Sequence, residues 1–177
     1  MADRVMIFID GSNLYNSLKS EFKRTDVSFA KLAECLTAGR ELRRTYYYVG
    51  LIDQAKEPKP YQAQQRFLAT LGNVPYFETR KGTLVYRNWP QERPIQKGVD
   101  VRLATDMLTH AFRNNFDVAI LVSGDSDFAD CLQVVKDQGK HVEVALFGPP
   151  TSSRRLREAA DRVTTLDAKF LANCWAK

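Results

Sequence analysis

The chain has 177 residues, of which 44% are hydrophobic and 27% are charged. These proportions, with only 9 glycines and 7 prolines, are ordinary for a globular protein and exclude fibrous, low-complexity and disordered classes. The 26 Lys and Arg residues exceed the 21 Asp and Glu residues, and the formal net charge of +5 permits a polyanionic partner without requiring one.

The apolar runs of the chain are short. The longest, at residues 5–9 and 118–122, fall far below the roughly 20 residues that span a bilayer, and the first has no small-residue cleavage site after it. The 3 cysteines are widely spaced and odd in number, which predicts neither a disulfide framework nor a zinc motif. We therefore expect a soluble, cytoplasmic protein without a membrane partner. The sequence leaves the oligomeric state open, a homodimer included.

Apolar runs alternate with helical patterns along the chain. Residues 5–9, 45–49, 118–122 and 142–147 form runs typical of buried strands, and residues 163–166 form a shorter candidate. Helical spacing predicts helices over residues 13–22, 29–37, 61–71, 101–113, 128–138 and 154–160. This alternation predicts one α/β domain over residues 1–177, a three-layer sandwich whose central, mainly parallel sheet is covered by helices on both faces.

One irregular region, residues 73–98, interrupts the pattern. The sequence RKGT at 80–83 predicts a hairpin turn between strands at 76–79 and 84–87. Basic and aromatic residues interleave here, as they do in proteins that bind unpaired nucleic acid, although a solvated hairpin with core aromatics explains them equally well. The candidate substrate contacts in this region are Arg80, Lys81, Arg87 and Lys97.

Two predicted strands end in acids that stand beside glycine. Residues 5–9 lead into DGSN, which begins with Asp10, and residues 118–122 lead into SGDSD, which holds Asp125 and Asp127. Ligands of parallel α/β sheets bind beyond the carboxyl ends of the strands, where the strand order switches. If these strands are neighbours at the switch, Asp10 and Asp125 converge on one crevice.

A third acid, Asp100, begins the helix predicted near 101–113. Helical spacing puts it beside Met107 and Ala111 at the edge of the inward stripe, where interaction with the helix dipole offers a structural alternative. The same reasoning leaves open whether Asp106 faces solvent or the site.

These acids also have structural alternatives as helix caps. For Asp10 or Asp125 alone, capping of the following helix is as good an explanation as ligand binding, but the pair beside glycines favours a shared site. Asp127 could equally cap the helix after it. Asn13 could be a cap or could orient Asp10, and we favour the second role slightly.

The grouped acids predict a metal site. Carboxylates in one crevice repel each other unless they keep protons or bind a cation. No His or Cys lies in these motifs, so the oxygen ligands favour Mg²⁺ or Mn²⁺ over zinc. An ion in such an open site can polarise a phosphodiester oxygen and activate water.

Several stretches share a family pattern in their order. They are FIDGSNLY at 8–15, KGVDV at 97–101, LATDML at 103–108, LVSGDSDF at 121–128 and GKHVEV at 139–144. Together they resemble the NYN domain, the LabA-like branch of the PIN-like nuclease superfamily, from about residue 5 to about residue 167.

The resemblance implies a Rossmann-like (PIN-like) α/β/α sandwich that hydrolyses RNA at an acidic Mg²⁺ or Mn²⁺ pocket. Carried over by position, the catalytic and metal-binding set is Asp10, Asp100, Asp125 and Asp127. The implied supporting residues are Asn13, Ser123 and Asp106, the last because the family pattern marks its position as acidic.

We therefore expect a metal-dependent ribonuclease acting on single-stranded or structured RNA. The main alternative is a non-catalytic RNA-binding or regulatory module of the same fold. Two remaining readings are a nucleotide-sugar transferase with its DxD motif at 125–127 and a phosphatase with Asp10 as nucleophile. The chain is short for the first, and Ser12 stands where the second needs an acid.

Overall fold

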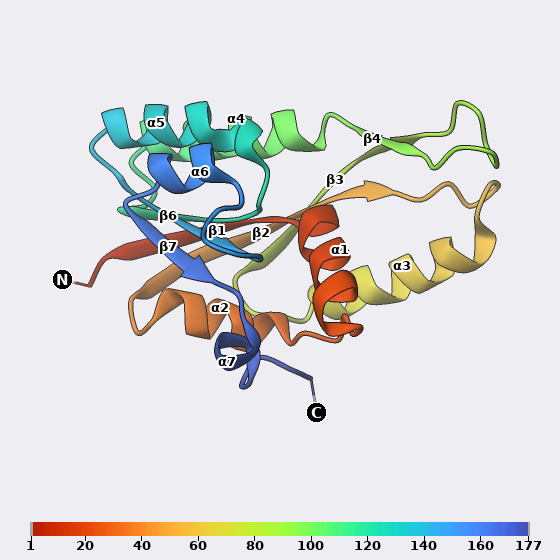
Figure 1. Cartoon of the computed structure of the whole chain (residues 1–177), viewed down its shortest axis with the longest axis horizontal. Helices are drawn as coiled ribbons and strands as arrows, with labels where there is room; N and C mark the ends of the chain where they lie inside the picture. The colour runs from red at the N-terminus through yellow and green to blue at the C-terminus, as the bar shows by residue number, and fades with distance from the viewer. Residues whose placement is uncertain (1, 177) are drawn as a thin grey trace.

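The protein is described here by a computed structural model that covers residues 2–176 (Figure 1). Its strands are β1 (Arg4–Asp10), β2 (Glu41–Leu51), β3 (Phe77–Val85), β4 (Ile95–Lys97), β5 (Val118–Val122), β6 (His141–Leu146) and β7 (Arg162–Thr165). Its helices are α1 (Gly11–Phe22), α2 (Phe29–Thr37), α3 (Pro58–Leu71), α4 (Val99–Phe112), α5 (Ala129–Asp137), α6 (Arg154–Ala159) and α7 (Ala168–Leu171), with a 3-10 turn η1 (Ser126–Phe128) before α5.

The seven strands form one sheet in the order β4-β3-β2-β1-β5-β6-β7. Neighbouring strands are parallel except β3 and β4. The chain builds outward from β1 to β4, returns to the other side of β1 at β5, and then builds outward to β7. The strand order therefore switches between β1 and β5, whose carboxyl ends lie side by side with Ile9 opposite Val122.

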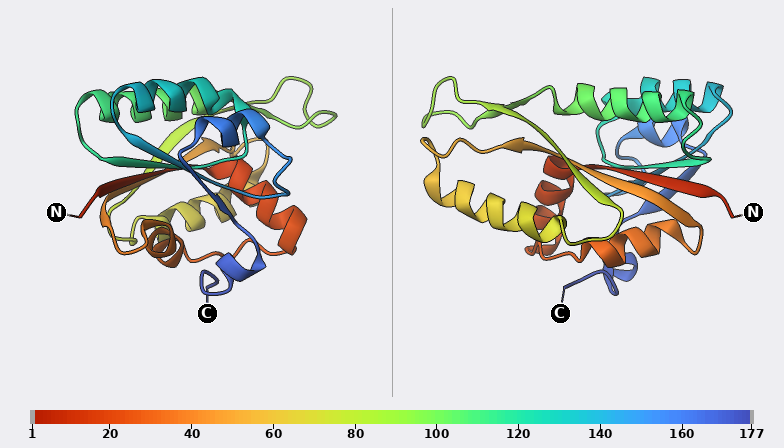
Figure 2. Two further views of the ribbon diagram at one scale, coloured as in Figure 1. Left: turned by 60° about the vertical axis from the view of Figure 1, so that its left-hand side comes forward. Right: turned by 180° about the vertical axis from the view of Figure 1, so that it is seen from behind.

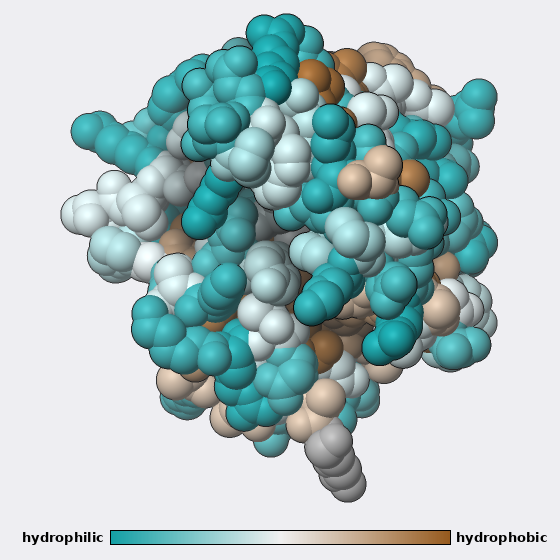
Figure 3. Space-filling view, turned by 90° about the vertical axis from the view of Figure 1, so that its right-hand side faces the viewer, coloured by the Kyte–Doolittle hydropathy of each residue, from teal (hydrophilic) through white to brown (hydrophobic). Residues whose placement is uncertain are grey.

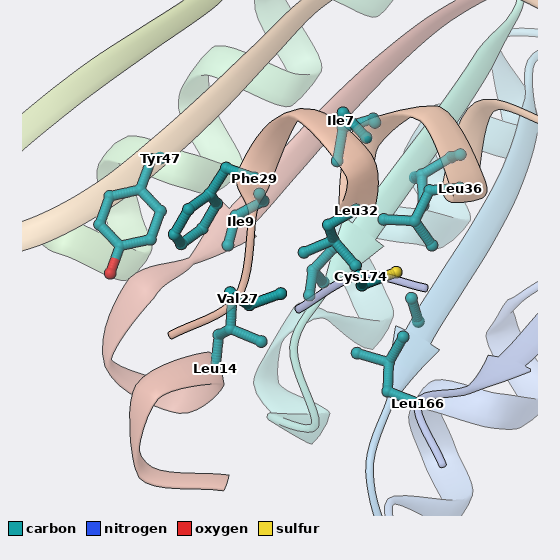
Figure 4. Close-up of a cluster of buried hydrophobic side chains, with 14 of the residues drawn as sticks. Ile7, Ile9, Leu14, Val27, Phe29, Leu32, Leu36, Tyr47, Leu166 and Cys174 are labelled. Atoms are coloured by element: carbon teal, nitrogen blue, oxygen red, sulfur yellow. The ribbon is translucent and has the colours of Figure 1, made fainter. Parts of the chain in front are cut away.

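Helices cover both faces of the sheet, which confirms the predicted α/β sandwich. Helices α1, α2, α3 and α7 lie on one face, and α4, α5 and α6 lie on the other (Figures 1 and 2). Alternate residues of β1 supply the two apolar layers: Ile7 and Ile9 face α1 and α2 (Figure 4), whereas Met6 and Phe8 face α4. By the same alternation Asp10, at the end of the strand, faces α4.

The hairpin predicted at residues 80–83 is wrong. Strand β3 runs without a break from Phe77 to Val85, parallel to β2, and the antiparallel return is the short β4. Gly82 is needed for close packing instead of a turn, because a Cβ there would lie 2.3 Å from Cγ2 of Val99 on α4. The turn falls between β3 and β4, in residues 86–94.

The helices begin and end within a few residues of the predicted bounds, and α2 has the predicted bounds of 29–37. Helix α7 was not predicted, since its single turn is too short to show a helical period. The thiols of Cys35 and Cys174 approach to 3.6 Å without a disulfide, and burial raises the pKa of Cys174 to about 12. Within residues 2–176, none of the helices has the length and apolar content that a membrane-spanning segment needs.

Candidate active site

Asp10 lies at the centre of the site, as the last residue of β1 and the N-cap of α1. Its carboxylate is almost completely buried and accepts three hydrogen bonds. Oδ1 accepts from the Asn13 backbone N–H at 3.1 Å and from the Ser12 hydroxyl at 3.0 Å, while Oδ2 accepts from the Ser123 hydroxyl at 3.1 Å. Capping and a place in the site are thus compatible, because all three donors are neutral groups and none of them forms an ion pair with the carboxylate.

Glycine at position 11 lets the chain turn from β1 into α1 directly against β2. A Cβ on Gly11 would lie 2.5 Å from Cζ of Tyr47 and 2.5 Å from the Tyr48 carbonyl oxygen, distances that real side chains do not show. The close approach fixes the helix N-terminus, and with it Asp10, at the edge of the sheet.

The loop after β5 is tied to Asp10 through hydroxyl and amide groups. The Ser123 hydroxyl donates to Asp10 and accepts from the backbone N–H of Asp125 at 3.1 Å. The Asn13 side-chain oxygen accepts from the Gly124 N–H at 3.0 Å, so Asn13 joins α1 to this loop. The expected convergence of the two strand ends is present in the structure.

The sequence DSD of residues 125–127 forms the turn that leads into α5. Asp125 is the N-cap of η1, and its Oδ1 accepts from the Asp127 backbone N–H at 2.9 Å. Asp127 is exposed and does not cap α5, which begins at Ala129 after Phe128 and has no side-chain cap. The carboxylate of Asp127 is therefore available to a ligand.

Asp100 joins this group from α4. It lies in the first turn of the helix, after Gly98 in a left-handed conformation. Partial burial raises the pKa of the Asp100 carboxyl, and the negative charges of Asp10, Asp125 and Asp127 raise it further. Four acids from three separate segments thus share one electrostatic environment at the strand-order switch.

Asp106 belongs to a different polar group. Its Oδ2 accepts from the Tyr48 hydroxyl at 2.9 Å and lies 3.4 Å from Nε of Arg80 on β3. Asp106 is not among the charges that shift Asp100. Its contacts join α4 to β2 and β3.

Of the four candidate substrate contacts in and between β3 and β4, one is already paired with acids and three are exposed. Arg80 is paired with Glu78 at 3.1 Å and with Asp106, and its guanidinium lies 4.9 Å from the centre of the Tyr46 ring. The other three candidates are exposed: Lys81, Arg87 and Lys97. Of the four candidates, these three therefore have side chains that a ligand can reach.

The acidic group offers oxygen donors, which Mg²⁺ and Mn²⁺ prefer. Among residues 2–176, no three or more His, Cys, Asp or Glu side chains are gathered so that they could hold an ion by themselves. Mg²⁺ in phosphoryl-transfer sites usually keeps several waters and uses one or two carboxylates with substrate phosphates. The donor set therefore fits an open site completed by water and phosphate rather than a closed protein cage.

Two residues of the site were missed by the sequence analysis. Ser12 was noted only as the residue that stands where a phosphatase needs an acid, yet its hydroxyl donates to Asp10. Ser153, just before α6, donates to the Gly124 carbonyl at 2.5 Å and supports the loop after β5. The position of Ser12 beside Asp10 could have indicated its role, whereas nothing in the sequence around Ser153 connects it with a loop 29 residues away.

The sequence model of the NYN domain matches residues 4–167. The chain belongs to the NYN domain family. This NYN domain has a nuclease-type fold, and its membership confirms the resemblance inferred from the ordered motifs.

Two comparisons place the NYN domain among known proteins. It is 26% identical over 170 residues to the low amplitude and bright protein LabA of Synechococcus elongatus, covering 93% of this chain and 84% of LabA. A protein of unknown function from Vibrio parahaemolyticus, VPA0982, has a TM-score of 0.71 and 22% identity, with 94% of both chains covered. The second likeness shows a shared fold.

Proposed function

We propose that this NYN domain is a metal-dependent ribonuclease that hydrolyses phosphodiester bonds of RNA at the acidic group beside β1 and β5. The observation that supports it most is that Ser123 and Asn13 join the ends of β1 and β5 around the buried Asp10, while the charges of Asp10, Asp125 and Asp127 act on Asp100. Such a concentration of negative charge is unfavourable by itself and becomes favourable when a cation is shared.

The surroundings of each acid indicate its role in the proposed site. Asp10 is fixed by three neutral donors and provides the least mobile oxygens. Asp125 is held by the turn that it caps, while Asp100 and Asp127 are less constrained and complete the negative surface. Rigid placement of charged oxygens is what stabilises the charge that develops during phosphoryl transfer.

Mg²⁺ or Mn²⁺, when bound, supplies the positive charge that polarises the phosphodiester and activates water. The chain would bind it through Asp10, Asp100, Asp125 and Asp127, directly or through water. Ser123 and Asn13 join the ends of β1 and β5, which carry Asp10 and the loop with Asp125 and Asp127.

The RNA backbone would reach the acids along the exposed cations. Lys97 lies at the end of β4 just before α4, Lys81 lies on β3, and Arg87 lies further out, in the turn between β3 and β4. Arg80 would contribute less to binding of RNA phosphates, because Glu78 and Asp106 already pair with its charge. Contacts of this kind hold phosphates without reading sequence.

The test is a time course of cleavage of labelled single-stranded RNA with Mn²⁺ or Mg²⁺, using the wild type, Asp10→Asn and Asp125→Asn. We expect each variant to lose about a hundredfold or more in rate, since a divalent ion contributes several kcal/mol to the transition state. Asparagine is also a good N-cap, so the fold should be retained.

Asp130→Asn is the matched control, because Asp130 is an exposed acid on α5 and its charge does not act on Asp100. It should cleave at the wild-type rate. Cleavage that persists in both Asp10→Asn and Asp125→Asn would contradict the proposal. RNA binding that weakens with salt but never leads to cleavage would support the non-catalytic RNA-binding module.

A further inference from the structure

A cleft of about 520 Å³ adjoins the acidic group on the other side of the turn from β1 to α1. It lies between α1, α3 and the ends of β2, β3 and β4. Its volume is within the range of roughly 300–1,000 Å³ typical of small-molecule sites. Figure 3 looks onto this edge of the molecule and shows a hollow with hydrophobic surface among hydrophilic side chains.

The cleft and the proposed active site lie on opposite sides of Gly11 and Ser12. Both residues line it, and the Ser12 hydroxyl donates to Asp10 at 3.0 Å. A chain whose phosphate lies at the acids therefore has the cleft within reach of the adjacent nucleotide.

Aromatic rings line the cleft, and a cation outside the lining lies next to one of them. Tyr15 on α1 is 49% exposed at the rim, and Phe67 on α3 is partly buried opposite. Nζ of Lys19, one turn after Tyr15, lies 6.0 Å from the centre of its ring. A ring with an adjacent positive charge is suited to stack a base and to attract its phosphate.

Two glutamines line the cleft, and only one of them is engaged. The Gln64 amide accepts from the Ile52 N–H at 2.9 Å and donates to the Gly50 carbonyl at 2.9 Å. The Gln96 amide on β4 is involved in no side-chain hydrogen bond among residues 2–176, and its Oε1 lies beside Gly50. Gln96 thus offers a donor and an acceptor to the edge of a ligand.

We propose that the cleft receives one unpaired nucleobase of the RNA, next to the phosphate at the acids, with Tyr15 stacking on the base and Gln96 bonding to its edge. The proposal rests on the proposed ribonuclease function and adds a base-specific contact to it. It implies that the enzyme acts on single-stranded segments, because a paired base could not enter the cleft.

The test measures RNA affinity separately from cleavage. The full chain with Asp125→Asn keeps the RNA intact, and fluorescence anisotropy gives the Kd of single-stranded RNAs that each lack the base at one position. We expect one position at which loss of the base weakens binding about five- to hundredfold. Added Tyr15→Ala should weaken binding of intact RNA by a similar factor and abolish the effect of that missing base.

Three further variants sharpen the result. Tyr15→Phe keeps the ring and should bind like the parent protein, and Phe112→Ala removes an exposed ring outside the cleft and should also have no effect. Gln96→Leu should narrow the spread of Kd values among RNAs that carry A, C, G or U at the sensitive position. These outcomes together support a base site.

The inference would be overturned if no position showed a missing-base effect, or if Tyr15→Ala left that effect unchanged. If the cleft binds an apolar small molecule and no base, no position of the RNA should show a missing-base effect. Either result would leave cleavage that depends on Asp10 and Asp125 untouched, so failure of the base site is distinguishable from failure of the proposed function.

Discussion

At the scale of single residues, the raised pKa of Asp100 shows that the acidic group is electrostatically unfavourable when no cation is bound. Partial burial and the negative charges of Asp10, Asp125 and Asp127 raise the pKa of its carboxyl above the ordinary 3.8. The folded protein therefore holds the Asp100 proton more firmly than the unfolded chain does. The resulting stability is fully present below pH 3.8 and is lost as the pH rises through the higher pKa of the folded state.

Because the charged form of Asp100 is unfavourable in the folded protein, Asp100→Asn should stabilise the protein at neutral pH when divalent ions are absent. We expect the free energy of unfolding at pH 7 to rise by up to about 1 kcal/mol, since solvent screens a partly exposed group. Urea unfolding at a series of pH values should show the gain vanishing in acid. With Mn²⁺ present, the wild type should have the higher free energy of unfolding, because it would bind the ion more tightly than Asp100→Asn does. Destabilisation of ion-free Asp100→Asn at pH 7 would contradict the account.

At the scale of elements, β3 and α4 pack closely enough to exclude any side chain at position 82. A Cβ on Gly82 would lie 2.3 Å from Cγ2 of Val99, which is itself buried at the start of α4. The contact positions the first turn of α4, and therefore Asp100, relative to the sheet.

Gly82→Ala should lower the free energy of unfolding by about 1–3 kcal/mol through overpacking. Adding Val99→Ala should relieve part of the clash, so that the double variant is more stable than the sum of the two single changes predicts. Gly72→Ala is the control, because Gly72 has a helical conformation and an added Cβ there would make ordinary contacts from 3.4 Å. Additive effects of Gly82→Ala and Val99→Ala would contradict the packing described.

The regular elements could be predicted from the sequence because their signals are local. The run at residues 5–9 is apolar at every position, as a strand buried on both faces must be, and the spacing in residues 29–37 follows the helical period. The hairpin at 80–83 failed because Gly82 looks like a turn residue in sequence. Its actual reason, contact with Val99, involves a residue on another element and has no local signal.

At the scale of the whole molecule, a buried ion pair joins the two halves of the sheet. Arg40, which follows α2, bonds both oxygens of Glu143 on β6, at 2.7 and 3.0 Å. The side chains are only 18% and 5% exposed. Removing the carboxylate would leave the Arg40 charge buried without its partner.

Glu143→Ala should therefore lower the free energy of unfolding by about 3–5 kcal/mol, a large part of the roughly 5–15 kcal/mol of a typical domain. Glu158→Ala, which removes an exposed pair with Arg154, should change it by less than about 1 kcal/mol. Thermal and urea unfolding would measure both. Equal effects of the two substitutions on the free energy of unfolding would show that the buried pair contributes no more to stability than the exposed pair does.

The candidate site could be predicted only in part. Asp10 and Asp125 were recognisable because each follows a buried run beside glycine, and the strand order then brings them together. The helical wheel could not place Asp106, because its position depends on Tyr48 and Arg80 from other strands. Contacts made by distant segments are decided by the packing of the whole chain, which no local pattern contains.

The most direct test of the central claim is a calorimetric titration of the purified protein with Mn²⁺, beside Asp10→Asn and Asp130→Asn. If the acids at β1 and β5 form an ion site, the wild type and Asp130→Asn should bind Mn²⁺ with the same affinity, and Asp10→Asn should bind it at least about tenfold more weakly. A flat titration of the wild type, or equal binding by Asp10→Asn, would contradict the account.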